Sequence, residues 1–173
     1  AHHIKLVFTT NLTNINQDIL EMCNNFTNVH WGTSIDGYGE LNNYIRSNSN
    51  WNVVDKNLKN LMKSKFSVGV HPTVCIYNIL HITELLQYVE DLWDGRFMPY
   101  IFLNLLQTPD YLSFQYLPED IKMQASKKLQ RYVVTSKYCA ADSSHKNTVM
   151  SIIRLLKNST YDRDKLSTMK RFN

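Results

Sequence analysis

The sequence is poor in the residues that mark fibrous and disordered chains. Only five Gly and four Pro occur among its 173 residues, whereas 43% of the residues are hydrophobic and 12% are aromatic. This composition excludes collagen-like, low-complexity and intrinsically disordered chains. The length suits one hydrophobic core rather than two full domains. We therefore expect one packed domain or a large part of one.

Long apolar runs are also missing. No stretch approaches the roughly 18 apolar residues that span a bilayer. The first five residues, Ala-His-His-Ile-Lys, lack the basic-then-apolar order of a signal peptide. His2 and His3 are interpreted as a tag remnant or a frayed start. We expect a cytoplasmic protein without a membrane partner.

Cysteine is scarce, and the three cysteines are far apart. Cys23, Cys75 and Cys139 are separated by 52 and 64 positions, so no local pair is available to ligate zinc or an iron–sulfur cluster. We predict three separate thiols and no metal ligands in this chain. His71 and Cys75 would share one face of a strand, which suggests a metal site, but a buried free cysteine is the alternative interpretation.

Excess charge of one sign is confined to the C-terminal end. The net charge is +4, and the last twenty residues alone carry +4. A nucleic-acid-binding domain would have more clustered basic residues with aromatic residues between them. We therefore expect the tail to be the solvated face of a terminal helix, and we expect no nucleic-acid partner.

Strand-like and helix-like segments alternate along the chain. Apolar runs rich in β-branched residues predict strands at 4–9, 29–35, 66–75 and 100–106. Helical spacing and capping residues predict helices at 15–23 (capped by Asn14 or Asn16), from Trp51 (capped by Asn50), from 83 (capped by Thr83), from Pro118, at 149–156 and at 162–172. This order predicts an α/β fold with parallel strands and helices on one or both faces.

Ligands of such sheets collect where the strands end and the following loops begin. The predicted strand ends are followed by four polar loops: Thr10-Asn11, Ser34-Ile35-Asp36-Gly37, 75–78 and 106–109. The aromatic residues around the last strand either line a substrate opening or pack in the core; they are Tyr100, Phe102, Tyr111, Phe114 and Tyr116.

These loops resemble the middle of radical S-adenosylmethionine enzymes of the twitch type, which are relatives of the SPASM peptide-modifying enzymes. The resemblance covers about residues 4–135 and depends on the order of the motifs. The motifs are Thr9-Thr10-Asn11, Ser34-Ile35-Asp36-Gly37-Tyr38-Gly39-Glu40, Tyr44-Ile45-Arg46, Asn50-Trp51, Val53-Val54, Asn57-Leu58, Pro72-Thr73-Val74, Asn78-Ile79-Leu80 and Pro109-Asp110-Tyr111-Leu112-Ser113.

The resemblance implies a partial (β/α) barrel over residues 1–135, with about four of the family's six strands, and a helical extension over 136–173. The intact family member binds S-adenosylmethionine and a [4Fe–4S] cluster held by a C-x-x-x-C-x-x-C motif, and it modifies a peptide or a small metabolite. That motif is absent from this sequence, so the chain is expected to be a fragment that begins at the third βα unit. We expect no catalytic residues, no bound cofactor and no activity from this polypeptide alone.

The resemblance also implies cofactor-binding residues. Thr10, Asn11 and Ser34 would face the cofactor, Arg46 would pair with the carboxylate of its methionine part, and Asn78 would contact the ribose. Two alternatives remain open: the first three residues may close turns or cap helices, and Arg46 may form an ordinary surface ion pair.

A different hypothesis is a non-catalytic α/β binding or scaffold module. The first predicted strand would then lie at an open edge of the sheet, which is a template for pairing with another chain. A homodimer formed through this edge is the partner that the hypothesis predicts.

Overall fold

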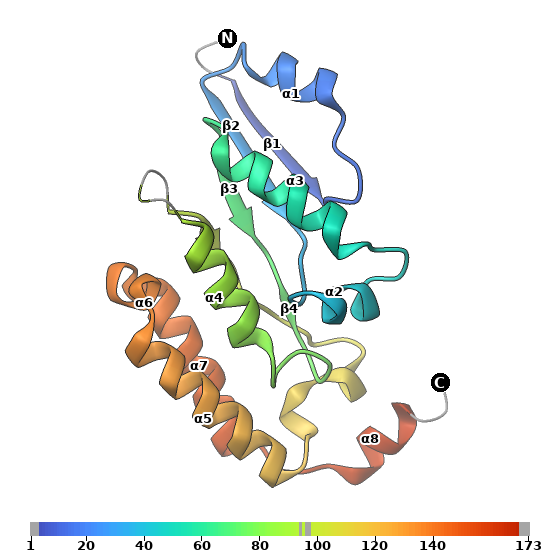
Figure 1. Ribbon diagram of the computed structural model, residues 1–173. Helices are drawn as coiled ribbons and strands as arrows, with labels where there is room; N and C mark the ends of the chain where they lie inside the picture. The colour runs from blue at the N-terminus through green and yellow to red at the C-terminus, as the bar shows by residue number, and fades with distance from the viewer. Residues whose placement is uncertain (1–3, 94, 96–97, 170–173) are drawn as a thin grey trace. The chain divides into compact units, whose positions relative to one another are not determined.

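The structure is a computed structural model that describes residues 4–93, 95 and 98–169 (Figure 1). These residues form two compact units. The first unit contains the described residues of 1–72 and 91–102, and the second contains those of 73–90 and 103–173. The boundary predicted at residue 135 follows from family resemblance alone and stays a prediction.

A four-stranded parallel sheet forms the centre of the first unit, which confirms the predicted α/β fold. The strand order is β1-β2-β3-β5, and all three neighbouring pairs are parallel. The strands are β1 (Lys5–Thr10), β2 (Asn28–Thr33), β3 (Ser67–Val70) and β5 (Tyr100–Ile101).

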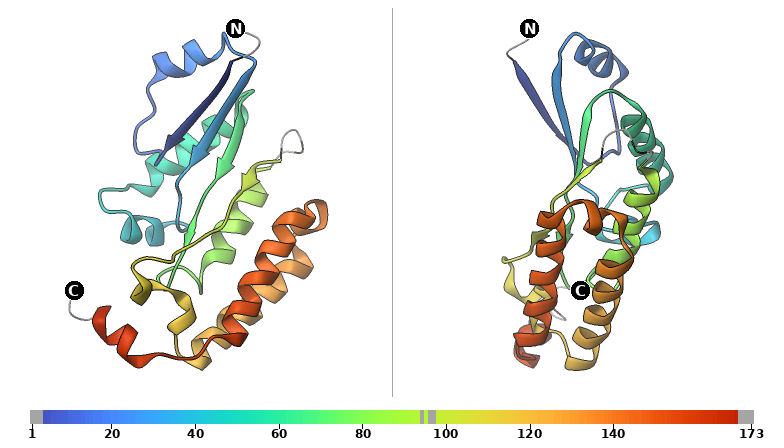
Figure 2. Two further views of the ribbon diagram at one scale, coloured as in Figure 1. Left: turned by 180° about the vertical axis from the view of Figure 1, so that it is seen from behind. Right: turned by 90° about the vertical axis from the view of Figure 1, so that its left-hand side faces the viewer.

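Apolar side chains cover one face of this sheet. Phe8, Trp31 and Val68 are aligned across β1, β2 and β3, and the rings of Phe8 and Trp31 stack with centroids 4.5 Å apart. Helices α1 (Gln17–Cys23) and α3 (Trp51–Lys63) lie on one side of the strands (Figure 2). Burial of this one face accounts for the alternation of apolar residues with polar residues or glycine along β2 and β3.

Residues of the opposite face, here called the open face, alternate along each strand with residues of the apolar face. It carries Val7, His30 and Ser67 in one row and Thr9, Gly32, Gly69 and Tyr100 in the next. Val7 is 60% exposed and Tyr100 is 51% exposed. In the first unit, one face of the sheet is therefore packed and the other is accessible.

Asparagine caps explain where α1 and α3 begin. The side chain of Asn16 accepts from the backbone N–H of Asp18 at 2.8 Å, and that of Asn50 accepts from Asn52 at 3.0 Å. Both predicted helix starts are confirmed. A further helix, α2 (Glu40–Ile45), was not predicted; Gly39 precedes it with φ of 64°, which suits glycine.

Two predicted strands are each broken in the structure. The segment 66–75 divides into β3 and β4 (Thr73–Val74), and the segment 100–106 divides into β5 and β6 (Asn104–Leu105). Pro72 has no N–H to donate to a neighbouring strand, which explains the first break. In the second unit β4 and β6 form a separate two-stranded parallel sheet.

The rest of the second unit is mostly helical. Thr83 lies inside α4, which begins at Ile82, so the predicted cap is wrong. Asp142 caps α7 through its carboxylate, and the helix therefore starts earlier than the predicted residue 149. The elements are α4 (Ile82–Leu92, its last two residues in the first unit), two 3₁₀ turns η1 (Asp110–Leu112) and η2 (Phe114–Tyr116), α5 (Glu119–Thr135), α6 (Lys137–Ala141), α7 (Ser143–Asn158) and α8 (Arg163–Met169).

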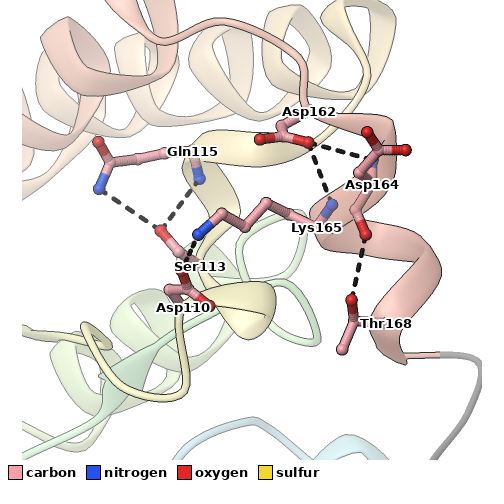
Figure 3. A network of polar contacts seen from close by, with 7 residues as sticks. All are labelled: Asp110, Ser113, Gln115, Asp162, Asp164, Lys165 and Thr168. Atoms are coloured by element: carbon pink, nitrogen blue, oxygen red, sulfur yellow. Dashed lines mark hydrogen bonds and ion pairs between the residues drawn. The ribbon is translucent and has the colours of Figure 1, made fainter.

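Charged side chains fix the start of α8 (Figure 3). The Asp162 carboxylate accepts from the backbone N–H groups of Asp164 and Lys165, at 3.1 Å each. The Lys165 ammonium pairs with Asp110 of η1, and this hydrogen bond lowers the pKa of the Asp110 carboxyl. Part of the basic tail thus anchors a helix. The predicted end of this helix, residues 170–172, lies outside the described residues.

No helix in the described part of the chain combines the length and the apolar character needed to cross a bilayer.

Candidate functional site

Polar residues meet at the carboxyl edge of β1 and β2. The backbone N–H of Ser34 donates to the carbonyl of Thr10 at 2.8 Å, so the pairing of the two strands continues one residue past β2. This bond places Thr10 and Ser34 side by side. The structure thus brings together two of the predicted cofactor-facing residues.

The loop after β1 is closed by its own side chains. The Thr10 hydroxyl accepts from the N–H of Leu12 at 3.0 Å, and the Asn11 amide oxygen accepts from both the N–H and the hydroxyl of Thr13. Leu12 is fully buried and has a φ of 63°. Thr10 and Asn11 therefore close a turn, which was the alternative interpretation. The Thr10 hydroxyl still has its proton to donate.

A buried asparagine organises the loop after β2. The Asn42 amide oxygen accepts from the N–H of Asp36 at 3.0 Å, and its amide nitrogen donates to the Ser49 hydroxyl at 3.1 Å. Asn42 is fully buried. Sequence reasoning missed this residue; its only signal is an asparagine inside a helix, where asparagine is a poor helix former.

Arg46 is held by the loop that Asn42 organises. Its Nε lies 2.8 Å from Asp36 Oδ2, and the side chains are 29% and 8% exposed, respectively. Nε is buried and makes no hydrogen bond of good geometry with the described residues, so its contact with Asp36 is an ion pair. The predicted ion pair is therefore present, and the two terminal nitrogens of a guanidinium form a planar pair of donors that suits an anion.

Asn78 belongs to the second unit and has structural contacts. Its amide oxygen accepts from the N–H of Cys75 and its amide nitrogen donates to the carbonyl of Thr73, both at 2.8 Å. Asn78 is fully buried. These bonds close the loop after β4. The predicted ribose contact stays a prediction, and such a contact would need this loop to open.

The described residues contain no group of three or more His, Cys, Asp or Glu side chains placed to hold a metal ion. Cys23, Cys75 and Cys139 are free and buried, which confirms the predicted separate thiols. The described residues therefore offer no ligand set for a [4Fe–4S] cluster.

The predicted aromatic cluster is divided between the two units. Tyr100 and Phe102 stack in the first unit with centroids 6.2 Å apart, and each is about half exposed. Phe114, in the second unit, is buried. Phe114 therefore packs in the core, whereas Tyr100 and Phe102 are exposed.

Comparison of the chain with protein-family models, with curated proteins and with solved structures finds no match.

Proposed function

We propose that this chain is part of a radical S-adenosylmethionine enzyme of the twitch type, whose intact form modifies a peptide or a small metabolite. The order of the loop motifs supports this proposal, as does a parallel sheet with helices on one face, which is the layer expected of a partial (β/α) barrel. The cofactor binds at the carboxyl edge of β1 and β2, through its methionine part.

The observation that carries the proposal is the arrangement of Arg46. Asp36 forms an ion pair with the guanidinium at Nε, and the guanidinium carries further donors at its two terminal nitrogens. A carboxylate is the planar anion that such a pair of donors binds with two hydrogen bonds. Ser34 and Thr10 lie at the same edge and supply hydroxyl groups. This set of donors suits the carboxylate of a methionine group.

Each predicted residue has a defined role in this proposal. Arg46 binds the carboxylate, Ser34 and Thr10 donate from their hydroxyl groups, and Asn11 keeps the first loop closed. Asn78 is assigned only an indirect part, since its amide holds the loop after β4. The cluster that cleaves the cofactor in the family has no ligand set among the described residues, so no cluster ligand is assigned to this chain.

A titration followed by NMR tests the cofactor contact. Without the cluster as a second anchor, we expect a dissociation constant of about 1 mM for S-adenosylmethionine, which corresponds to roughly 4 kcal/mol of binding free energy. The backbone signals of Ser34, Gly37 and the Nε signal of Arg46 should shift on titration. Decarboxylated S-adenosylmethionine, which lacks the anion, should shift them at least about tenfold more weakly.

Arg46→Ala should abolish the shifts, whereas Arg131→Ala, on the exposed surface of α5, should leave them unchanged. Equal shifts with the decarboxylated compound, or equal binding by Arg46→Ala, would contradict the proposal.

A second candidate function is favoured by the edge strand β1. No strand of the described residues pairs with its outer edge. Val7 on β1 is 60% exposed, and Ile4, which precedes β1, is 51% exposed. In this proposal the chain is a scaffold module, and two copies pair through β1 as a symmetric dimer.

Light scattering over a range of concentrations tests this candidate. Val7→Lys should shift the equilibrium toward the monomer, because a charged residue on an edge strand opposes pairing. Val134→Lys is the matched control, since Val134 is 85% exposed on α5. A wild-type chain that stays monomeric at all concentrations would remove this candidate without affecting the cofactor proposal.

A further inference from the structure

Two histidines lie together on the open face of the first unit. His30 is in β2, His71 follows β3, and their ring centroids are 6.2 Å apart. Both side chains are half-buried. Imidazoles bound to one tetrahedral ion at Zn–N distances of about 2.0–2.1 Å have centroids about 5 Å apart. The two rings are therefore slightly farther apart than a shared ion requires, and a small side-chain movement would bring them to that spacing.

The two rings converge over a glycine. A methyl group on Gly69 would lie 2.7 Å from His71 Nε2 and 3.2 Å from His30 Nε2. A methyl group on Gly32 would lie 2.9 Å from His71 Cε1. Glycine at both positions leaves room for the His71 ring above the strands. Nε2 of both histidines consequently lies close to Gly69.

Hydrogen bonding leaves these Nε2 atoms available. Nδ1 of His30 is 3.0 Å from the Ser67 hydroxyl. A histidine that binds a metal ion through one ring nitrogen usually makes a hydrogen bond through the other. Nε2 of His71 is buried and has no hydrogen-bond partner among the described residues. A buried polar atom without a partner costs free energy, and a bound ligand would remove that cost.

The protonation of the pair also suits ligation. Burial lowers the pKa of both histidines, with a further lowering by Lys5 for His30 and by His30 for His71. A lowered pKa favours the neutral imidazole, which is the form that binds metal ions.

We propose that His30 and His71 form a two-histidine site for a divalent transition-metal ion of the zinc type. The protein supplies two nitrogen ligands, and the remaining coordination positions face the open side of the sheet, where Val7 and Tyr100 are exposed. Zinc accepts imidazole nitrogen and keeps open positions when few protein ligands are present. The proposal is independent of the cofactor site and would stand if S-adenosylmethionine did not bind.

Calorimetry with zinc chloride tests this site. His2 and His3, which lie outside the described residues, are replaced by alanine in every sample, because they would compete for the metal. One zinc ion should bind per chain. His30→Ala and His71→Ala should each weaken binding at least about tenfold, and Ser67→Ala, which removes the partner of Nδ1, should weaken it about tenfold. His71→Gln provides a second variant if His71→Ala does not fold.

His81→Ala is the matched control, because His81 is an exposed histidine of the second unit that pairs with Glu84. Imidazole ¹⁵N NMR gives an independent readout: zinc should shift the Nε2 signals of His30 and His71 and leave that of His81 unchanged. Absence of zinc binding, binding that survives both His30→Ala and His71→Ala, or a change at His81 instead would overturn the proposal.

Discussion

Buried histidines in the two units have different surroundings. In the second unit, His145 is 3% exposed, its Nε2 lies 3.2 Å from the Tyr132 hydroxyl, and its ring packs edge-on against Tyr138. In the first unit, His30 and His71 lie on an accessible face, and Nε2 of His71 lacks a protein partner. The first arrangement stabilises a helical hairpin, whereas the second leaves nitrogen atoms available to a ligand.

Carboxylates differ in the same way. Glu90 of the second unit uses both oxygens within the protein: one accepts from the Ser136 hydroxyl at 2.7 Å and the other from the N–H of Lys137 at 2.6 Å. Asp36 of the first unit instead forms an ion pair with Arg46, whose side chain is 29% exposed.

The largest effect is expected from Glu90→Ala. This change leaves the Ser136 hydroxyl and the Lys137 N–H without their acceptor in a buried site, so the free energy of unfolding should fall by about 3 kcal/mol. Urea denaturation measures it. Glu84→Gln, at an exposed position, should change it by less than about 0.5 kcal/mol. A similar loss in both variants would show that the Glu90 network does not stabilise the second unit.

A smaller effect is expected from Asn42→Ala in the first unit. The N–H of Asp36 loses its acceptor and the Ser49 hydroxyl loses its donor, so the free energy of unfolding should fall by about 2 kcal/mol. Asn43→Ala on the same helix serves as the control, because the amide nitrogen of Asn43 donates an exposed hydrogen bond to Glu40. If Asn42→Ala were as stable as the control, the loop after β2 would not depend on this amide.

The smallest effect is a pH dependence from His30 and His71. Their pKa values are lowered in the folded chain, so below about pH 6.5 the unfolded chain binds protons that the folded chain does not. The free energy of unfolding should therefore fall as the pH drops from 6.5 toward the folded pKa values, and these groups should contribute no pH dependence above that range. Urea denaturation at several pH values measures the slope.

Replacing both histidines by glutamine should reduce that slope between about pH 5 and 6.5. An unchanged slope would mean that other groups cause the acid sensitivity.

The longer elements of the fold were predictable from sequence. Asn16 and Asn50 marked the starts of α1 and α3 because capping is a local interaction. Helices α2 and α6 were missed because they contain only six and five residues and depend on tertiary contacts. The break between β3 and β4 was predictable, because Pro72 cannot donate a ladder hydrogen bond and implies a bend or a strand end there. The break between β5 and β6 was missed because continuous apolar character says nothing about which strand is the neighbour.

The candidate sites were only partly predictable. Arg46 and Ser34 came from the resemblance, but the Asp36 partner joins residues ten positions apart across a loop. His30 and His71 were each considered without the other, since they are 41 positions apart and meet only through strand register. The sequence did not show that Gly32 and Gly69 make room for a histidine ring. Which side chains lie over a strand depends on the strands beside it in the fold.

The three buried thiols make the two units separately observable. Cys23 reports on the first unit, and Cys75 and Cys139 report on the second. Burial raises the pKa of Cys23 and Cys139, so these side chains stay protonated and react slowly with thiol reagents until the surrounding structure opens. The rate of labelling at each cysteine therefore measures how often its own unit opens, without any engineered residue.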